Sequence, residues 1–171
     1  VQDIYNSNYR FPPPPKKPTM TAVPGDGKVT LYWDRVAEES LDPVTKEKDF
    51  QGYKIYRATD PNFNDVRNIT DANGLIQGYS TLAQFDKKDE INGYFYPSKN
   101  LFQDTKGYSF YLGDDSGLVH SYIDRDVQNG RTYYYALVAY DHGDEEKDIF
   151  PSENSKFISV LPTGQIITDQ N

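Results

Sequence analysis

The longest strand candidate places the strongest constraint on the fold of this chain. It covers residues 131–140, follows the turn dipeptide Asn129-Gly130, and consists mostly of Tyr, Val, Leu and Ala. Side chains alternate between the two faces of a strand, and here both faces are apolar. One face carries Tyr133, Tyr135, Leu137 and Ala139, and the other carries Tyr134, Ala136, Val138 and Tyr140. We therefore expect a central strand of a β-sheet.

Shorter alternating runs predict that the rest of the chain is also built from strands. The run 28–34 follows the turn dipeptide Asp26-Gly27 and places Trp33 on its apolar face. The run 52–57 places Tyr53 and Ile55 on one face. No stretch of ten residues combines helical periodicity with capping residues, so the sequence predicts an all-β fold.

Two later runs complete the set of strand candidates in the main part of the chain. Residues 118–124 alternate, but the pattern leaves open which of its faces is buried. Residues 155–161 are expected to close the sheet, because Pro162 and Gly164 end the run before a polar tail.

The ends of the chain differ in composition from this strand-rich part. Residues 1–17 end in four prolines and two lysines, which favours a stiff, Pro-rich extended arm or linker. Residues 18–162 hold the strand candidates, and residues 163–171 are predicted to be a C-terminal tail or linker. Because the chain begins with Val1 and not with Met, we expect a processed product or an excised segment.

Three segments occur in an order that is typical of one known family. They are Asp26-Gly-Lys-Val-Thr-Leu-Tyr-Trp33, Gly52-Tyr-Lys-Ile-Tyr-Arg57, and Tyr122-Ile-Asp followed by a turn and Tyr133-Tyr-Tyr-Ala-Leu-Val-Ala139. In these segments the chain resembles bacterial fibronectin type III modules. The resemblance implies an immunoglobulin-like antiparallel β-sandwich in which the Tyr133 hydroxyl bonds nearby backbone. The core side chains expected on this basis are Trp33, Tyr53, Ile55, Tyr133, Tyr135 and Leu137.

Two departures separate this chain from the family pattern, a long loop over residues 34–51 between the second and third strands and a longer insertion. About 60 residues, 58–117, lie between the expected third and fifth strands, which is too long for a bare loop. Residues 75–85 and 107–113 within it have strand-like composition. We expect them to extend one sheet or to form a hairpin flap on the sandwich.

The composition limits the classes of partner. The chain has 18 Lys and Arg against 26 Asp and Glu, a net charge of −8, which does not favour a nucleic-acid partner. Mean hydropathy is −0.79, and no apolar run approaches the roughly 20 residues that cross a bilayer, so no membrane span is expected. The sequence has no Cys, which excludes thiol catalysis, disulfides and Cys-based zinc sites.

The sequence gives little sign of catalysis. Its two histidines, His120 and His142, lie apart and are accompanied by no recognisable nucleophile motif. The closest approach to a phosphate loop, 113–117, carries two aspartates where backbone donors are needed. We expect neither an enzyme nor a bound cofactor, with calcium as the one alternative.

The calcium alternative depends on one acidic stretch of the insertion. Asp60, Asn62, Asn64 and Asp71 offer oxygen ligands at a spacing partly like that of a calcium loop. Asp65 stands where such a loop needs Gly, and Asp71 stands where a bidentate Glu is usual. An ordinary Asp/Asn turn is the competing interpretation.

Aromatic residues are dense in the second half of the insertion. Tyr94, Phe95 and Tyr96 lead this group, which could contact a protein partner or stack on sugar rings. A flap of this length also needs its own core, so we expect most of these rings to be buried.

These observations favour a non-catalytic structural or interaction module, secreted or on the surface of a bacterium, within a surface, adhesive or filament-type assembly. Its partners would be other domains of the same chain or neighbouring subunits, with the chain ends as possible contact segments. The alternative is an accessory module of a secreted carbohydrate-active enzyme, in which the aromatic residues contact carbohydrate.

Overall fold

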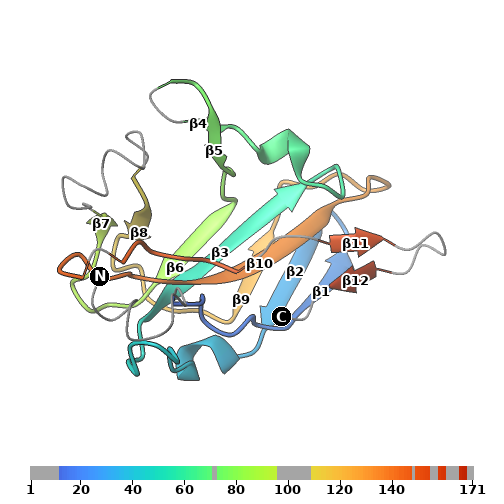
Figure 1. Cartoon of the computed structure of the whole chain (residues 1–171). Helices are drawn as coiled ribbons and strands as arrows, with labels where there is room; N and C mark the ends of the chain where they lie inside the picture. The colour runs from blue at the N-terminus through green and yellow to red at the C-terminus, as the bar shows by residue number, and fades with distance from the viewer. Residues whose placement is uncertain are drawn as a thin grey trace.

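The chain folds as an all-β sandwich of two antiparallel sheets (Figure 1). The computed structural model describes residues 12–70, 73–95, 109–147, 149–154, 158–160 and 166–168. One sheet has the order β1-β2-β9, formed by Met20–Gly25, Lys28–Trp33 and Ser121–Asp124. The other has the order β10-β3-β6, formed by Tyr134–Asp141, Phe50–Ala58 and Ala83–Asp86. The predicted all-β, antiparallel sandwich is confirmed.

The turn dipeptides lie where the sequence predicted them. Asp26 and Gly27 form the two-residue connection between β1 and β2, and Gly27 has a φ of 59° that most other residues avoid. The second turn lies against the first, because the Gly27 N–H donates to Asn129 Oδ1 at 2.9 Å and Asn129 Nδ2 donates to Asp26 Oδ1 at 2.6 Å. The two predicted turns therefore contact each other at one end of the sandwich.

The predicted core lies between the two sheets. Trp33, Tyr53, Ile55 and Leu137 are buried there, while Tyr135 is half-buried and packs against them. The Trp33 and Tyr53 rings meet edge to face, with centroids 5.8 Å apart.

Tyr133 lies just before β10 and is half-buried. Its hydroxyl oxygen accepts a hydrogen bond from the Gln128 N–H at 3.0 Å. The resemblance implied this contact between the tyrosine and nearby backbone.

The second face of the β10-β3-β6 sheet is also covered, which explains why both faces of β10 are apolar. Phe63 of the insertion joins a buried cluster with Tyr56 of β3 and Val138 of β10. Phe95 and Phe110 join a second cluster, with Tyr140 of β10. The central strands are thus buried between the other sheet and the insertion.

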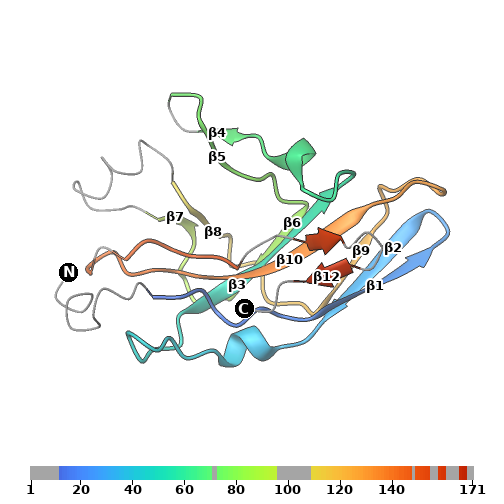
Figure 2. The ribbon, with the colours of Figure 1, turned by 45° about the vertical axis from the view of Figure 1, so that its right-hand side comes forward.

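The insertion forms strands, as predicted. β6 extends the main sheet by pairing with β3. β4 (Ile69–Thr70) pairs with β5 (Ile76–Gly78), and β7 (Gly93–Tyr94) pairs with β8 (Tyr111–Gly113). Figures 1 and 2 show both small hairpins on the side of the molecule away from β1 and β2.

The last strands differ from the prediction. Residues 155–161 were expected to close the main sheet, but β11 (Ile158–Val160) pairs with β12 (Ile166–Thr168) instead. β12 lies in the segment predicted to be a tail. This pairing is local. Two short strands separated by a short Pro- and Gly-containing segment pair with each other more readily than with a strand that is distant in the sequence.

The helical segments of the described residues are two short 3₁₀ turns, η1 (Val36–Glu39) and η2 (Asn64–Val66). In the described ranges no helix is long and apolar enough to cross a bilayer.

Candidate functional site

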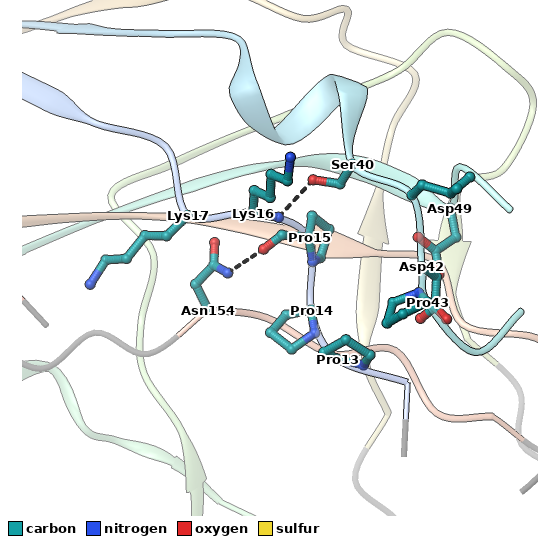
Figure 3. Close-up of a pocket in the computed structure, with 11 residues that line it drawn as sticks. Pro13, Pro14, Pro15, Lys16, Lys17, Ser40, Asp42, Pro43, Asp49 and Asn154 are labelled. Carbon is teal, nitrogen blue, oxygen red and sulfur yellow. Dashed lines mark hydrogen bonds between the residues drawn. The ribbon is translucent and has the colours of Figure 1, made fainter. Parts of the chain in front are cut away.

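A pocket of about 360 Å³ lies between the proline segment and the loop that connects β2 to β3 (Figure 3). Its wall includes Pro13, Pro14 and Pro15 from the segment, Asp42 and Asp49 from the loop, and Asn154. Because its lining comes from three distant parts of the sequence, the pocket exists only in the folded chain.

Hydrogen bonds hold the proline segment against the sandwich. The Lys16 N–H donates to Ser40 Oγ at 2.7 Å, and Asn154 Nδ2 donates to the Pro15 carbonyl at 2.6 Å. Asn154 Oδ1 in turn accepts the N–H of Ala139 in β10 at 2.9 Å. Residues 12–17 therefore form part of the domain surface, and this part of the predicted linker is not a free spacer.

Asp42 organises the loop. Its Oδ1 accepts the N–H groups of Val44 and Thr45 at 2.6 and 2.8 Å, and its backbone carbonyl accepts the N–H of Lys46. These bonds form an Asx turn, which the Asp42-Pro43 dipeptide favours. The residue is 4% exposed, and across the described residues its Oδ2 accepts no hydrogen bond.

Asp49 lies beside Asp42 at the same end of the pocket (Figure 3). Burial raises the pKa of the Asp49 carboxyl, and the negative charge of Asp42 raises this pKa further. The pair thus concentrates negative charge next to apolar proline walls.

Another aspartate, Asp141, is buried and stabilises the neighbouring turn. It begins the acidic stretch 141–148 of the sequence, yet it is 3% exposed. Its Oδ1 accepts the N–H groups of Gly143 and Ser152 at 3.1 and 2.9 Å, and its Oδ2 accepts the Ser152 hydroxyl at 2.5 Å. Burial raises the pKa of Asp141 to about 7, against the effect of these hydrogen bonds.

The predicted calcium loop closes on its own hydrogen bonds. Asp60 accepts the N–H groups of Asn62 and Asn64 at 3.2 and 3.1 Å, and it also accepts Asn64 Nδ2. Asp71 lies outside the described residues. Where the structure is described, no three His, Cys, Asp or Glu side chains are grouped closely enough to hold a metal ion. The geometry seen at Asp60 is that of an Asx turn.

The predicted aromatic contact residues divide between surface and core. The Tyr94 side chain is 52% exposed, and its ring lies 5.1 Å from that of Tyr111. Phe95 is only 1% exposed and packs against Phe110 and Tyr140, so its ring is not available to a ligand. Tyr96 lies outside the described residues.

One polar cluster lacked any signal in the sequence. Glu38 Oε1 accepts the Tyr53 hydroxyl at 3.0 Å and lies 2.5 Å from His120 Nε2. Burial and the nearby Glu38 raise the pKa of Tyr53. Glu38 and His120 are 82 positions apart, so only the folded chain brings them together. The cluster closes one end of the core beside Trp33.

Comparisons of this chain with protein-family models, curated proteins and solved structures gave no significant match.

Proposed function

We propose that this chain is a non-catalytic structural or interaction module of a bacterial secreted or cell-surface assembly, and that it contacts a second copy of itself through the outer face of the β1-β2-β9 sheet. The exposed side chains of this face carry the proposal. Val23 is 47% exposed, Tyr32 51% and Ile123 44%.

The register makes these side chains one continuous surface. Thr30 of β2 pairs with both Val23 and Ile123, and Tyr32 pairs with Thr21 and Ser121 in the adjoining row. Directly paired residues, and residues two positions apart in one strand, share a face, so the outer face consists of Thr21, Val23, Lys28, Thr30, Tyr32, Ser121 and Ile123.

One of these seven residues, Lys28 at the turn end of β2, is charged, and none is acidic, although the chain has 26 Asp and Glu. A partly apolar sheet face without acidic side chains, on a chain of net charge −8, favours contact with another protein surface over solvation. Two copies could bury this face against each other, with Lys28 at its turn end as the one charge that each copy contributes.

The relationship to fibronectin type III modules is part of this proposal. It is supported by the packing of Trp33 in β2 against Tyr53 in β3 and by the hydrogen bond between Gln128 and the Tyr133 hydroxyl. Such modules commonly serve as repeated structural units, which agrees with a contact role.

The test is self-association of the 171-residue chain, measured by sedimentation velocity from about 5 µM to 1 mM, the range of weak interfaces. We expect Tyr32→Lys and Ile123→Lys each to weaken association at least tenfold. Leu75→Lys is the control, because Leu75 is 54% exposed but lies in the insertion. A wild-type chain that stays monomeric throughout, or variants that associate like wild type, would contradict the proposal.

Carbohydrate contact is the second candidate, and the Tyr94–Tyr111 pair favours it. An exposed ring that contacts a second ring, tilted by 55° to it, suits stacking on a sugar. Polysaccharide binding that is lost in Tyr94→Ala, and retained in Tyr32→Ala, which removes a ring of similar exposure, would support this role. Equal binding by both variants would exclude Tyr94 as the contact.

A further inference from the structure

The pocket beside the proline segment has one side that presents hydrogen-bond acceptors, while the donor side chains of its lining are those of Lys16, Lys17, Ser40 and Asn154. Proline has no N–H, so the backbone of Pro13, Pro14 and Pro15 presents only carbonyl oxygens. The carboxylates of Asp42 and Asp49 lie across from this segment. A group that binds here has to donate hydrogen bonds, and positive charge would strengthen them.

Asp42 provides the more specific observation. A carboxylate that is 4% exposed needs donors on both of its oxygens, since burying an unsatisfied charged acceptor destabilises the fold. Oδ1 has two backbone donors, whereas in the described residues Oδ2 has none. A cationic donor entering the pocket would supply the missing interaction.

The basic residues of the pocket wall do not fill this role. Lys16 and Lys17 both contribute to the lining. Figure 3 shows the Lys17 side chain extending to the opposite side of the pocket and the Lys16 side chain turned away from Asp42 and Asp49. The acidic end therefore faces the pocket without either of these ammonium groups beside it.

The size of the pocket favours an organic cation over a bare metal ion. Its volume of about 360 Å³ falls at the lower end of the range of pockets that hold small organic ligands. Calcium requires six to eight oxygens at close range, and the described residues bring no three acidic or histidine side chains together. The prolines and Leu41 provide apolar walls on which an alkyl chain can pack.

We propose that this pocket binds an organic cation, an alkylguanidinium or alkylammonium group, with its charged head on Asp42 and Asp49 and its alkyl chain along Pro13, Pro14 and Leu41. The cation is either a free small molecule or the end of an Arg or Lys side chain. The site is separate from the β1-β2-β9 outer face. The chain's net charge of −8 favours the approach of cations.

The probe is butylguanidinium, titrated into the 15N-labelled 171-residue chain and followed by amide NMR. The amides of Val44 and Thr45 are the reporters, because both donate to Asp42. We expect saturable shifts there with a Kd of about 1 mM, typical for a ligand of this size. Butylurea, its uncharged isostere, should bind at least tenfold more weakly.

Variants locate the charge requirement. Asp42→Asn keeps Oδ1 for the loop, and Asp49→Asn removes the second charge; each should weaken butylguanidinium at least tenfold. Glu47→Gln is the matched control, because it removes one charge from the same loop at a side chain that is 64% exposed and outside the pocket lining. The butylurea comparison needs no variant and stays informative if one fails to fold.

A second arm separates the two sources of the cation. Tighter binding of Nα-acetyl-arginine methylamide than of butylguanidinium assigns the site to a side chain of a protein, and equal or weaker binding assigns it to a free cation. Equal binding of butylurea, shifts confined to other regions, or unchanged affinity in both Asn variants would overturn the proposal. Saturation of the same amides by Ca²⁺ at lower concentration would overturn the organic assignment.

Discussion

Asp124 joins the two sheets, and its replacement provides the most direct test of the sandwich. The residue ends β9 in one sheet, and its side chain is 2% exposed. Arg57 of β3, in the other sheet, donates from Nη1 to both Asp124 oxygens at 3.1 and 3.0 Å. Tyr135 of β10 donates its hydroxyl at 2.7 Å, and the Asp126 N–H donates at 3.0 Å. Four donor contacts converge on one buried carboxylate.

Asp124→Asn keeps the shape of the side chain but places an amide donor against Arg57 or Tyr135. It also leaves the half-buried guanidinium without its buried counter-charge. Removing one partner of a buried ion pair costs about 3–5 kcal/mol. A domain of this size has a free energy of unfolding of roughly 5–15 kcal/mol, so this change removes a large part of it.

Asp126→Asn is the matched control. Asp126 also binds Arg57, through Oδ2 at 2.9 Å, but its side chain is 92% exposed. Solvent screens that pair, so we expect a cost below about 1 kcal/mol.

Urea unfolding followed by Trp33 fluorescence measures both variants. Trp33 is the one tryptophan in the sequence and is 7% exposed in the core, so its emission reports loss of sheet packing. The double variant Arg57→Met/Asp124→Asn should be less destabilised than the sum of the single changes, with a coupling of about 1–3 kcal/mol. Equal small effects of Asp124→Asn and Asp126→Asn, or strict additivity, would refute a buried link between the sheets.

Three further predictions use other contacts. Gly52→Ala should destabilise the fold by about 3 kcal/mol or more, because its new Cβ would lie 2.4 Å from a carbonyl oxygen of β6. Gly25→Ala is the control, because its Cβ would contact only the flexible side chain of Lys28. It should lower the free energy of unfolding by under about 1 kcal/mol in the same urea assay. The pKa of Asp141 is raised to about 7, so the folded state holds a proton that the unfolded state releases near pH 4. The contribution of this proton to the free energy of unfolding should be full below about pH 4. It should fall by on the order of 2–4 kcal/mol as the pH rises through 7. Asp141→Asn keeps an acceptor for the same N–H groups, and the difference between its pH profile and that of wild type isolates the effect; parallel profiles would contradict it. Tyr133→Phe should cost about 1 kcal/mol in thermal unfolding, since it leaves the Gln128 N–H without its acceptor.

Local sequence patterns were sufficient to predict most of the sandwich. A period of two and a turn dipeptide are properties of a few adjacent residues, so Trp33, Tyr53 and Leu137 could be placed in the core before any contact was known. The buried face of residues 118–124 was left open because both faces mix polar and apolar side chains. The structure resolves it through Tyr122, which packs on the core, while Ile123 is exposed.

The pocket could not be predicted in the same way, because the contacts that bring its walls together join distant positions of the sequence. Asn154 binds Pro15 across 139 positions. The Asp42-Pro43 dipeptide signals a turn, but no local pattern shows that the carboxylate of this turn is buried. The prolines signal a stiff segment, and a stiff segment packs on a surface as readily as it spans a gap, since little conformational entropy is lost on binding.

The double-sided burial of β3 and β10 shows how the insertion and the sandwich depend on each other. Tyr56 and Val138 point away from the other sheet and would be exposed if the insertion were absent, yet they are 2% and 0% exposed. Burial of such side chains contributes about 1.5–3 kcal/mol each, so residues 58–117 stabilise the central strands as well as adding surface. A chain with this insertion replaced by a short loop should therefore bind a hydrophobic dye and unfold at lower urea concentration. If the insertion instead folds as an independent flap, the urea midpoint of unfolding should be unchanged. The two outcomes distinguish a core that the insertion shares with the sandwich from a separate core of the insertion.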